Sequence, residues 1–400
     1  MKYKSFVLLY LLLTLVLSSC SDSGYDPTRT AETVAQAEDK IDEHLQAIEE
    51  PTPPDTTISF AACGDNIMYY GTIRDGKKCA YKGGREHNFA PIYENIKHII
   101  EGADIAFINQ ESPMAGEGYE LGTYPHFNSP QDLAYDLLDA GYDVVNIANN
   151  HMLDTGSEGL LRTIEFWNTL PVVTLGGYLD EEDCNNMRVV EREDVKIGFL
   201  SYTYSTNGYK LKSGYDIFIP YIDETLIETQ IKAAREKFDL VFVSIHWGNE
   251  NNMKQSESQS ALAKKMADWG ADVILGHHPH VLQPIEWIER EGGGRTLCIY
   301  SLGNFVAEMP RDYNLLGGIM TFDIVRRDGE LSIENPILIP TMYYYNKSFY
   351  KNSVHLLENF TSDMAKSIGL SYYGQSTNLD RLYGYLEKTI SPEFLKGTEQ

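Results

Sequence analysis

The chain has 400 residues, of which 42% are hydrophobic, which is enough for one large or two modest domains with a sizeable core. Its formal charge of −25 at pH 7 disfavours general binding to nucleic acid, because an acidic surface repels phosphate backbones. None of its five cysteines forms a Cys-x-x-Cys pair, which argues against a structural zinc knuckle.

The N-terminus has the pattern of a secretory signal. Lys2 and Lys4 precede an apolar run over residues 6–17 that is short for a membrane span, and Leu17-Ser18-Ser19-Cys20 follows. This last segment resembles the lipobox of bacterial lipoproteins, in which the cysteine is acylated. We therefore expect a signal peptide over residues 1–19 and a lipid anchor on Cys20, so that the exported protein is held at a membrane of the cell envelope. The alternative is an ordinary signal peptide that happens to contain a cysteine.

An acidic, proline-containing tether is expected over residues 20–57, followed by an α/β domain over residues 58–340. Strand-like and helix-like runs alternate in this domain. The expected strands lie at 58–62, 103–108, 144–147, 172–174, 196–201, 240–245, 273–275 and 297–300, and the expected helices at 89–100, 130–140, 158–168, 224–237 and 256–269. Two later strands, 318–326 and 331–340, have no helix between them and predict an antiparallel pair. Residues 341–400 predict a C-terminal extension with helices at 359–368 and 379–390.

Polar motifs follow six of the predicted strands. In α/β sheets ligands bind beyond the carboxyl ends of the strands, so these motifs are expected to meet. Each motif alone has a structural explanation as a turn, a helix cap or a core histidine, but the set together predicts a functional site. Imidazole and carboxylate groups without thiolates suit divalent zinc, manganese or iron. The motifs are Gly64-Asp65-Asn66, Asn109-Gln110-Glu111, Asn149-Asn150-His151 with Asp154, His246-Trp247-Gly248-Asn249-Glu250, Gly276-His277-His278-Pro279-His280 and Ser301-Leu302-Gly303-Asn304.

The order of these motifs resembles that of the calcineurin-like metallophosphoesterases. The amino acids in and around these motifs are similar to those of the CapA (poly-γ-glutamate capsule synthesis) family. The similar segments are residues 104–113, 148–154, 246–250, 276–281 and 300–305. The match runs in order from about residue 58 to residue 306. The resemblance implies a metallophosphoesterase-like sandwich of β-sheets flanked by helices, with one or two divalent ions at the strand ends.

The resemblance also implies roles for individual residues. The implied metal ligands are Asp65, Glu111 (or, less well matched, Asn109), Asn150, His246, His278 and His280. His151 matches the histidine that assists the leaving group, with Asp154 to orient it. Asn109, Asn149, Glu250, His277 and Asn304 are expected to line the site. Many relatives have a histidine two residues after the first aspartate, but this chain has Ile67 there, so one metal position is expected to be weak or empty.

Three functions fit these observations. The first is a CapA-like envelope protein for synthesis, release or anchoring of an anionic polymer such as poly-γ-glutamate, together with membrane-bound capsule synthase components. The second is a metal-dependent hydrolase of a phosphoester or another envelope bond. The third is a non-catalytic binding protein.

Two further segments have open interpretations. Five basic residues either border the predicted site or belong to an ordinary polar loop: Arg74, Lys77, Lys78, Lys82 and Arg85. An aromatic cluster near the C-terminus is expected to pack against the main domain, or else to bind a sugar or a partner: Tyr343, Tyr344, Tyr345, Phe349 and Tyr350.

Overall fold

A computed structural model describes residues 53–80 and 84–395. The expected signal peptide, Cys20, most of the tether and Lys82 therefore lie outside the described residues. The described residues from Asp55 onward belong to one unit, which contains every predicted strand.

The first sheet is built around β1 (Thr56–Asn66), whose residues from Phe60 onward are all buried. β1 pairs in parallel with β2 on one side and antiparallel with β12 on the other. Among the described residues this sheet has eight strands, in the order β14-β13-β12-β1-β2-β3-β4, with β11 paired to the end of β1. Their bounds are β2 (Ile105–Gln110), β3 (Val144–Asn146), β4 (Val173–Leu175), β11 (Asn304–Val306), β12 (Leu316–Arg327), β13 (Glu330–Tyr344) and β14 (Ser353–Leu356).

The second sheet has six strands in the described part of the chain, in the order β5-β6-β7-β8-β10-β9. β6, β7, β8 and β10 are parallel, and β5 and β9 close the two edges in antiparallel pairing. β7 and β8 are buried along their whole length, as parallel strands covered on both faces require. The bounds are β5 (Arg188–Arg192), β6 (Val195–Thr203), β7 (Leu240–His246), β8 (Val273–His277), β9 (Ile285–Glu289) and β10 (Arg295–Ile299).

The two sheets pack face to face through phenylalanine side chains. The ring centroid of Phe60 on β1 lies 5.3 Å from that of Phe242 on β7 and 6.4 Å from that of Phe199 on β6. Phe322 on β12 stacks on Phe60 with the centroids 4.7 Å apart. All four rings are buried, so they join the apolar faces of both sheets into one core.

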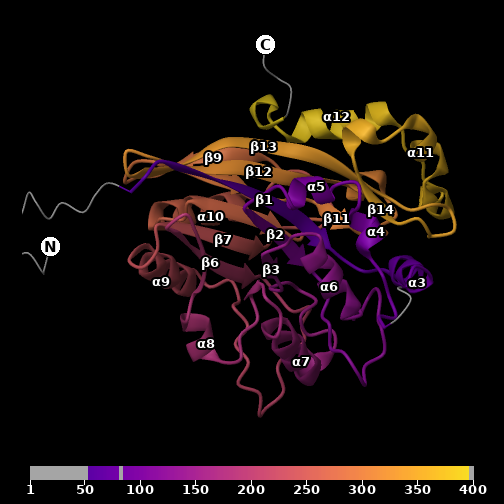
Figure 1. The fold of residues 1–400 in the computed structure, drawn as a ribbon, viewed down its shortest axis with the longest axis horizontal. Helices are drawn as coiled ribbons and strands as arrows, with labels where there is room; N and C mark the ends of the chain where they lie inside the picture. The colour runs from indigo at the N-terminus through magenta and orange to yellow at the C-terminus, as the bar shows by residue number, and fades with distance from the viewer. Residues whose placement is uncertain (1–52, 81–83, 396–400) are drawn as a thin grey trace, which may run out of the picture. The chain divides into compact units, whose positions relative to one another are not determined.

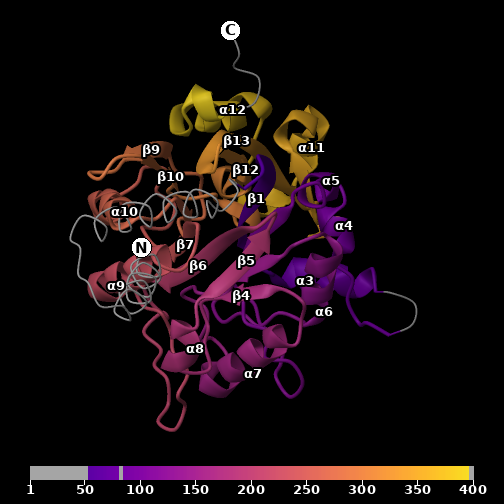
Figure 2. The same cartoon turned by 60° about the vertical axis from the view of Figure 1, so that its left-hand side comes forward.

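Helices flank this pair of sheets. α9 and α10 pack on the second sheet, and Figure 2 shows them beside β6 and β7 on the side away from β1. α12 lies over β13 (Figure 1). Two sheets flanked by helices confirm the predicted α/β sandwich. The bounds are α3 (Tyr70–Lys78), α4 (Ala90–Tyr93), α5 (Lys97–Ile100), α6 (Asp132–Asp139), α7 (Gly156–Asn168), α8 (Glu181–Asn185), α9 (Glu224–Arg235), α10 (Glu257–Trp269), α11 (Ser362–Ser367) and α12 (Leu379–Thr389).

The predicted helix over residues 89–100 is wrong in one respect, since it is split into α4 and α5. Ile92, Ile96 and Ile100 are buried, as the apolar spacing predicts. The backbone between the two helices turns more tightly, because Ile96 and Ile99 donate to carbonyl groups three residues earlier. Four short strands are absent from the prediction: β5, β9, β11 and β14.

The C-terminal region is part of the first sheet. The expected boundary at residue 340 falls inside β13, and β14 pairs antiparallel with β13, so the extension is not wholly helical. The antiparallel pair β12–β13 is confirmed. Cys63 and Cys298 are buried thiols as predicted, and the four described cysteines are free.

Candidate metal centre

Glycines let the strand ends approach the loop that follows β10. A Cβ atom on Gly64 would lie 2.1 Å from the carbonyl oxygen of Gly303, and one on Gly276 would lie 2.0 Å from that of Tyr300. Such distances leave no room for a side chain, so both positions require glycine. The close approach brings Asp65, at the end of β1, beside the turn that follows β8.

The predicted ligands form two overlapping groups. Asp65, Glu111 and His246 present one donor atom each within 4.8 Å of one another, and Glu111, His278 and His280 do the same. Oε1 of Glu111 lies 3.6 Å from Nε2 of His246 and 3.7 Å from Nε2 of His280. Glu111 is therefore common to both groups, in the place where a bridging carboxylate would lie.

Several side-chain atoms of these residues lack hydrogen-bond partners among the described residues. They are both carboxylate oxygens of Glu111, Nδ1 of His246 and Nδ1 of His278, and all three residues are buried. An unpaired buried polar atom costs about 1–3 kcal/mol, so several in one place indicate a missing ligand. Carboxylate oxygen and imidazole nitrogen suit a divalent transition metal. The residues present therefore fit the expected cation.

The turn after β8 has an unusual backbone. His278 has φ +96° and His280 has φ +57°, the left-handed region that non-glycine residues rarely adopt. The amide N–H of His278 donates to Oδ2 of Asp65 at 3.3 Å, and Nδ1 of His280 lies 3.1 Å from the same oxygen. Such strain persists where the surrounding structure enforces it, and it is common at functional sites.

The charges in the site are strongly coupled. Burial would raise the pKa of Asp65, but contacts with His277 and His280 and their positive charge hold it well below its usual range. Burial and the negative charge of Asp65 raise the pKa of Glu111. Burial lowers the pKa of His246 well below 6.5, and burial together with the charge of His280 lowers that of His278 to about 3. Neutral imidazoles keep the lone pairs that a metal requires.

His280 behaves differently from the other imidazoles. Burial would lower its pKa, but the negative charge of Glu111 and the bond to Asp65 raise it to about 10. The two buried acidic groups thus favour the protonated form of His280. A cation bound at the same place would take over that charge balance and displace the proton.

Neighbouring side chains hydrogen-bond to the candidate ligands or pack beside them. Nδ2 of Asn109 donates to Oδ1 of Asp65 at 2.8 Å, and Nδ2 of Asn146 donates to Oδ1 of Asn109 at 2.7 Å. Oδ1 of Asn304 lies 3.0 Å from Nδ1 of His280. His277 stacks on Phe107 with the ring centroids 5.6 Å apart. These contacts fix ligand orientation, as outer residues do around metals.

The motif after β3 divides into three different positions. Oδ1 of Asn150 accepts a hydrogen bond from Nε2 of His246 at 2.9 Å, so Asn150 lies with the ligand group. Asn149 instead bonds to the backbone at Gln110 and His151, which fixes the turn. Nδ1 of His151 donates to Oδ2 of Asp154 at 2.7 Å. The same oxygen also accepts the amide N–H of Phe127.

Glu250 was expected to line the site, and Ile67 stands where many relatives have a histidine. Glu250 is exposed, yet its charge contributes to raising the pKa of both Glu111 and His280, so it lies near the rim. Ile67 is buried in a small apolar cluster with Phe127 and Ala307. Its hydrocarbon side chain has no atom that could bind a metal.

Tyr204 is a site residue that the sequence analysis does not identify. Its ring centroid lies 4.5 Å from that of His278 and 6.3 Å from that of His246. Tyr204 directly follows β6, so it lies at a strand end like the ligands, and that position was the available signal. The residue is 42% exposed, so its ring lies between solvent and the two histidines.

Glu308 is a second buried carboxyl group outside the predicted motifs. It is 4% exposed and accepts hydrogen bonds from the Thr72 hydroxyl at 2.8 Å and the Gly71 amide at 3.1 Å. The Thr72 hydroxyl also contacts the Tyr343 hydroxyl at 2.9 Å. Burial raises the pKa of Glu308 to about 7, although the hydrogen bonds from Thr72 and Gly71 oppose the shift.

The basic stretch contacts neighbouring elements. The guanidinium of Arg74 lies 4.2 Å from the ring centroid of Tyr350, and the Lys78 amine lies 4.5 Å from the same ring. Arg85 pairs with Asp136 at 3.0 Å. The contacts of Arg74 and Lys78 join α3 to the C-terminal region, and that of Arg85 joins the following loop to α6. All three charges therefore take part in local packing and do not lie among the candidate ligands.

The C-terminal aromatic cluster packs largely inward. Tyr343 and Tyr345 are buried, and Tyr345 stacks on Phe349 with centroids 5.3 Å apart. Packing against the main domain, the first of the two interpretations, therefore describes these residues.

No helix in the described part of the chain is both long and apolar enough to cross a bilayer.

Comparisons with known proteins relate the chain to capsule synthesis proteins. It is 30% identical over 223 residues to the capsule biosynthesis protein CapA of Bacillus anthracis, covering 54% of this chain and 53% of that one. It is 32% identical over 219 residues to the PGA biosynthesis protein CapA of Bacillus subtilis (strain 168), covering 54% and 56%. The chain thus spans about half the length of these curated relatives.

A solved structure with a similar arrangement is the calcineurin-like phosphoesterase YfkN from Bacillus subtilis. It is 15% identical with a TM-score of 0.43, over 84% of this chain and 97% of that one. The sequence profile described as "Bacterial capsule synthesis protein PGA_cap" matches residues 59–309, which is more than half of the chain. This confirms the resemblance to CapA, and the protein belongs to the bacterial capsule synthesis protein PGA_cap family.

Proposed function

We propose that this protein acts in the synthesis, release or anchoring of an anionic surface polymer such as poly-γ-glutamate. Family membership supports the proposal, since the relatives in Bacillus are named for capsule and PGA biosynthesis. The observation that carries it is the buried group around Glu111, a carboxylate whose two oxygens have no hydrogen-bond partner among the described residues.

The residues that would hold a divalent cation come from both sheets: Asp65, Glu111, Asn150, His246, His278 and His280. When bound, such a cation acts as a Lewis acid that offsets developing negative charge. The protein's own contribution is to hold these groups in place before substrate arrives, through Asn109, Asn304 and the strained turn after β8.

A second function, hydrolysis of a phosphoester or another envelope bond, is favoured by the pair His151 and Asp154. Asp154 accepts from Nδ1 of His151, which leaves Nε2 as the atom that can hold or pass a proton. His151 lies close to the ligands, since its charge contributes to lowering the pKa of His278. His151 is therefore placed to assist a leaving group beside the metal centre.

The test pairs metal content with polymer production. The full chain, Glu111→Gln and a control at an exposed residue of α5, His98→Ala, would be expressed in host cells that lack their own copy. We expect the wild type and His98→Ala to retain divalent metal and restore surface polymer, and Glu111→Gln to lose both. Restoration of polymer by a metal-free Glu111→Gln protein would contradict a role for the metal centre in this function and favour a non-catalytic binding protein. Failure of the wild type to restore polymer would contradict the proposed function itself.

We also propose that Cys20 carries a lipid that holds the protein at the cell envelope, near membrane-bound capsule synthase components. The support is the apolar run and the Leu17-Ser18-Ser19 segment before Cys20. Cys20→Ser should release soluble protein or leave an unprocessed precursor, as measured by cell fractionation and mass. A variant that stays in the membrane and is cut at the same point would contradict the anchor.

A further inference from the structure

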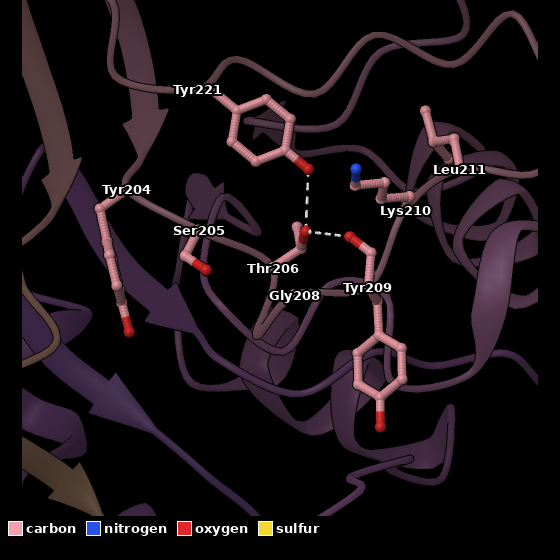
Figure 3. Close-up of a pocket in the computed structure, with 8 residues that line it drawn as sticks. All are labelled: Tyr204, Ser205, Thr206, Gly208, Tyr209, Lys210, Leu211 and Tyr221. Carbon is pink, nitrogen blue, oxygen red and sulfur yellow. Dashed lines mark hydrogen bonds between the residues drawn. The ribbon is translucent and has the colours of Figure 1, made fainter.

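A pocket lies in the loop that leaves the end of β6, next to the metal centre. Its volume is about 460 Å³, within the range of about 300–1,000 Å³ that is common for small-ligand sites. Figure 3 shows Tyr204, Thr206, Tyr209, Lys210 and Tyr221 around it. None of the sequence motifs includes these residues.

The base of the pocket is a tight, hydrogen-bonded turn. The Thr206 hydroxyl donates to the carbonyl of Tyr209 and contacts the Tyr221 hydroxyl, both at 2.8 Å (Figure 3). The Tyr209 hydroxyl lies 2.6 Å from Nε2 of His126, in another loop. The pocket is therefore formed before a ligand binds, which lowers the entropic cost of binding.

Two contacts connect the pocket to the metal centre. Nδ2 of Asn150, a candidate ligand, donates to Oδ1 of Asn207 in the same turn at 3.2 Å. Tyr204 lines the pocket and also packs on His278 with ring centroids 4.5 Å apart. Tyr204 is therefore shared by the pocket and the group of candidate ligands.

The lining combines flat aromatic surface with one cation. Tyr204, Tyr209 and Tyr221 expose 42%, 44% and 40% of their surface. The Lys210 amine points toward the Tyr221 side of the pocket in Figure 3. Among the described residues Lys210 forms no ion pair, although the chain has a net charge of −25. A free ammonium beside a tyrosine-lined pocket indicates an anionic ligand with an apolar stem.

We propose that this pocket binds a segment of an acidic peptide polymer, with one side-chain or main-chain carboxylate on Lys210, and directs the segment to the metal centre. The inference rests on the proposed function. The tyrosine faces contact methylene groups of the polymer, and the Tyr221 hydroxyl, which donates its proton to Thr206, can accept a hydrogen bond from an amide N–H of the polymer. A phosphate polymer fits less well, because phosphate sites favour arginine forks or several backbone N–H groups, and the pocket residues include no arginine.

The test measures binding of a γ-linked glutamate oligomer to the full chain by titration calorimetry, with and without a chelator. Lys210→Ala should bind about fivefold more weakly or worse, and Lys210→Glu more weakly still. The matched control is Lys212→Ala, which removes the same charge two residues away, outside the pocket lining, and should bind like the wild type. A neutral glutamine oligomer of equal length should bind the wild type as weakly as the glutamate oligomer binds Lys210→Ala.

The outcomes separate this inference from the proposed function. A loss specific to Lys210 that persists in the chelator supports the pocket even if the metal-content test fails. Equal binding by the wild type and Lys210→Ala, or no binding by the wild type, overturns the inference and leaves the metal-content test to judge the proposed function. Displacement of the oligomer by equimolar inorganic phosphate would also overturn it, in favour of a phosphate ligand.

Discussion

Glu308→Gln should gain stability relative to the wild type as pH rises from about 4.5 to 7, and the gain should stay constant at higher pH. Glutamine has nearly the same shape as glutamate, and its amide oxygen can accept the Gly71 N–H while its amide nitrogen donates to the Thr72 hydroxyl, which can accept as well as donate. What it removes is the need to ionise a buried group. The pKa of Glu308 is about 7 in the folded protein, against 4.5 for an ordinary glutamate.

The size of the effect follows from these two pKa values. Below pH 4.5 the carboxyl group is protonated in both states, and its full contribution to stability is present. As pH rises toward 7 the unfolded chain releases the proton while the folded protein retains it, so stability falls by about 1.4 kcal/mol per pH unit. Above pH 7 both states are ionised and the loss is complete. Between pH 5.5 and pH 8 the wild type should lose about 2 kcal/mol through this group.

The assay is urea unfolding of the wild type and Glu308→Gln at pH 5.5 and pH 8. Other titrating groups are common to both proteins and cancel in the difference between them. Tyr343→Phe is the control from the same cluster: burial raises the pKa of Tyr343 well above 10, so its hydroxyl stays protonated throughout. That variant should change stability equally at both pH values. A stability difference between Glu308→Gln and the wild type that does not change with pH would refute the reasoning.

Three further predictions concern the metal centre. His278→Ala should contain less divalent metal than the wild type when measured by elemental analysis, because His278 forms one donor group together with Glu111 and His280. Unchanged metal content would exclude His278 as a ligand. His151→Ala should keep its metal but lose about 10²–10⁴-fold in any turnover the wild type shows, and metal loss or full activity would contradict its assigned position. Gly276→Ala should lower the free energy of unfolding by about 1–3 kcal/mol or more in urea, since its Cβ would meet the Tyr300 carbonyl; wild-type stability would contradict the close approach.

The candidate ligands were predictable because their signals are local. Each follows a short apolar run, and a run of this kind that ends in Asp65 or His246 can be recognised without knowledge of its neighbours. Within each sheet the topology then brings these ends together, because parallel strands share the edge at which their carboxyl ends lie. The face-to-face packing of the two sheets joins the two groups of ends. Chain order and strand direction were enough to expect a common site.

Other features depend on contacts that no local pattern contains. Glu308 is buried because it meets Thr72, which is 236 residues away in the chain. β11 and β14 have three and four residues, too few for an alternating pattern to stand out, and they exist through pairing with β1 and β13. Tyr204 follows β6 and could have been found by the same reasoning as the ligands, but a single tyrosine does not resemble a metal-binding motif.

The distribution of the candidate ligands over both sheets has a consequence for how the protein acquires metal. Asp65 and Glu111 follow strands of the first sheet, whereas His246 and His278 follow strands of the second. Neither sheet alone has a complete donor set, so the ion can enter only after the phenylalanine-lined faces have packed together. A cation held by these groups would therefore be taken from the compartment in which folding finishes, not from the one in which the chain is made.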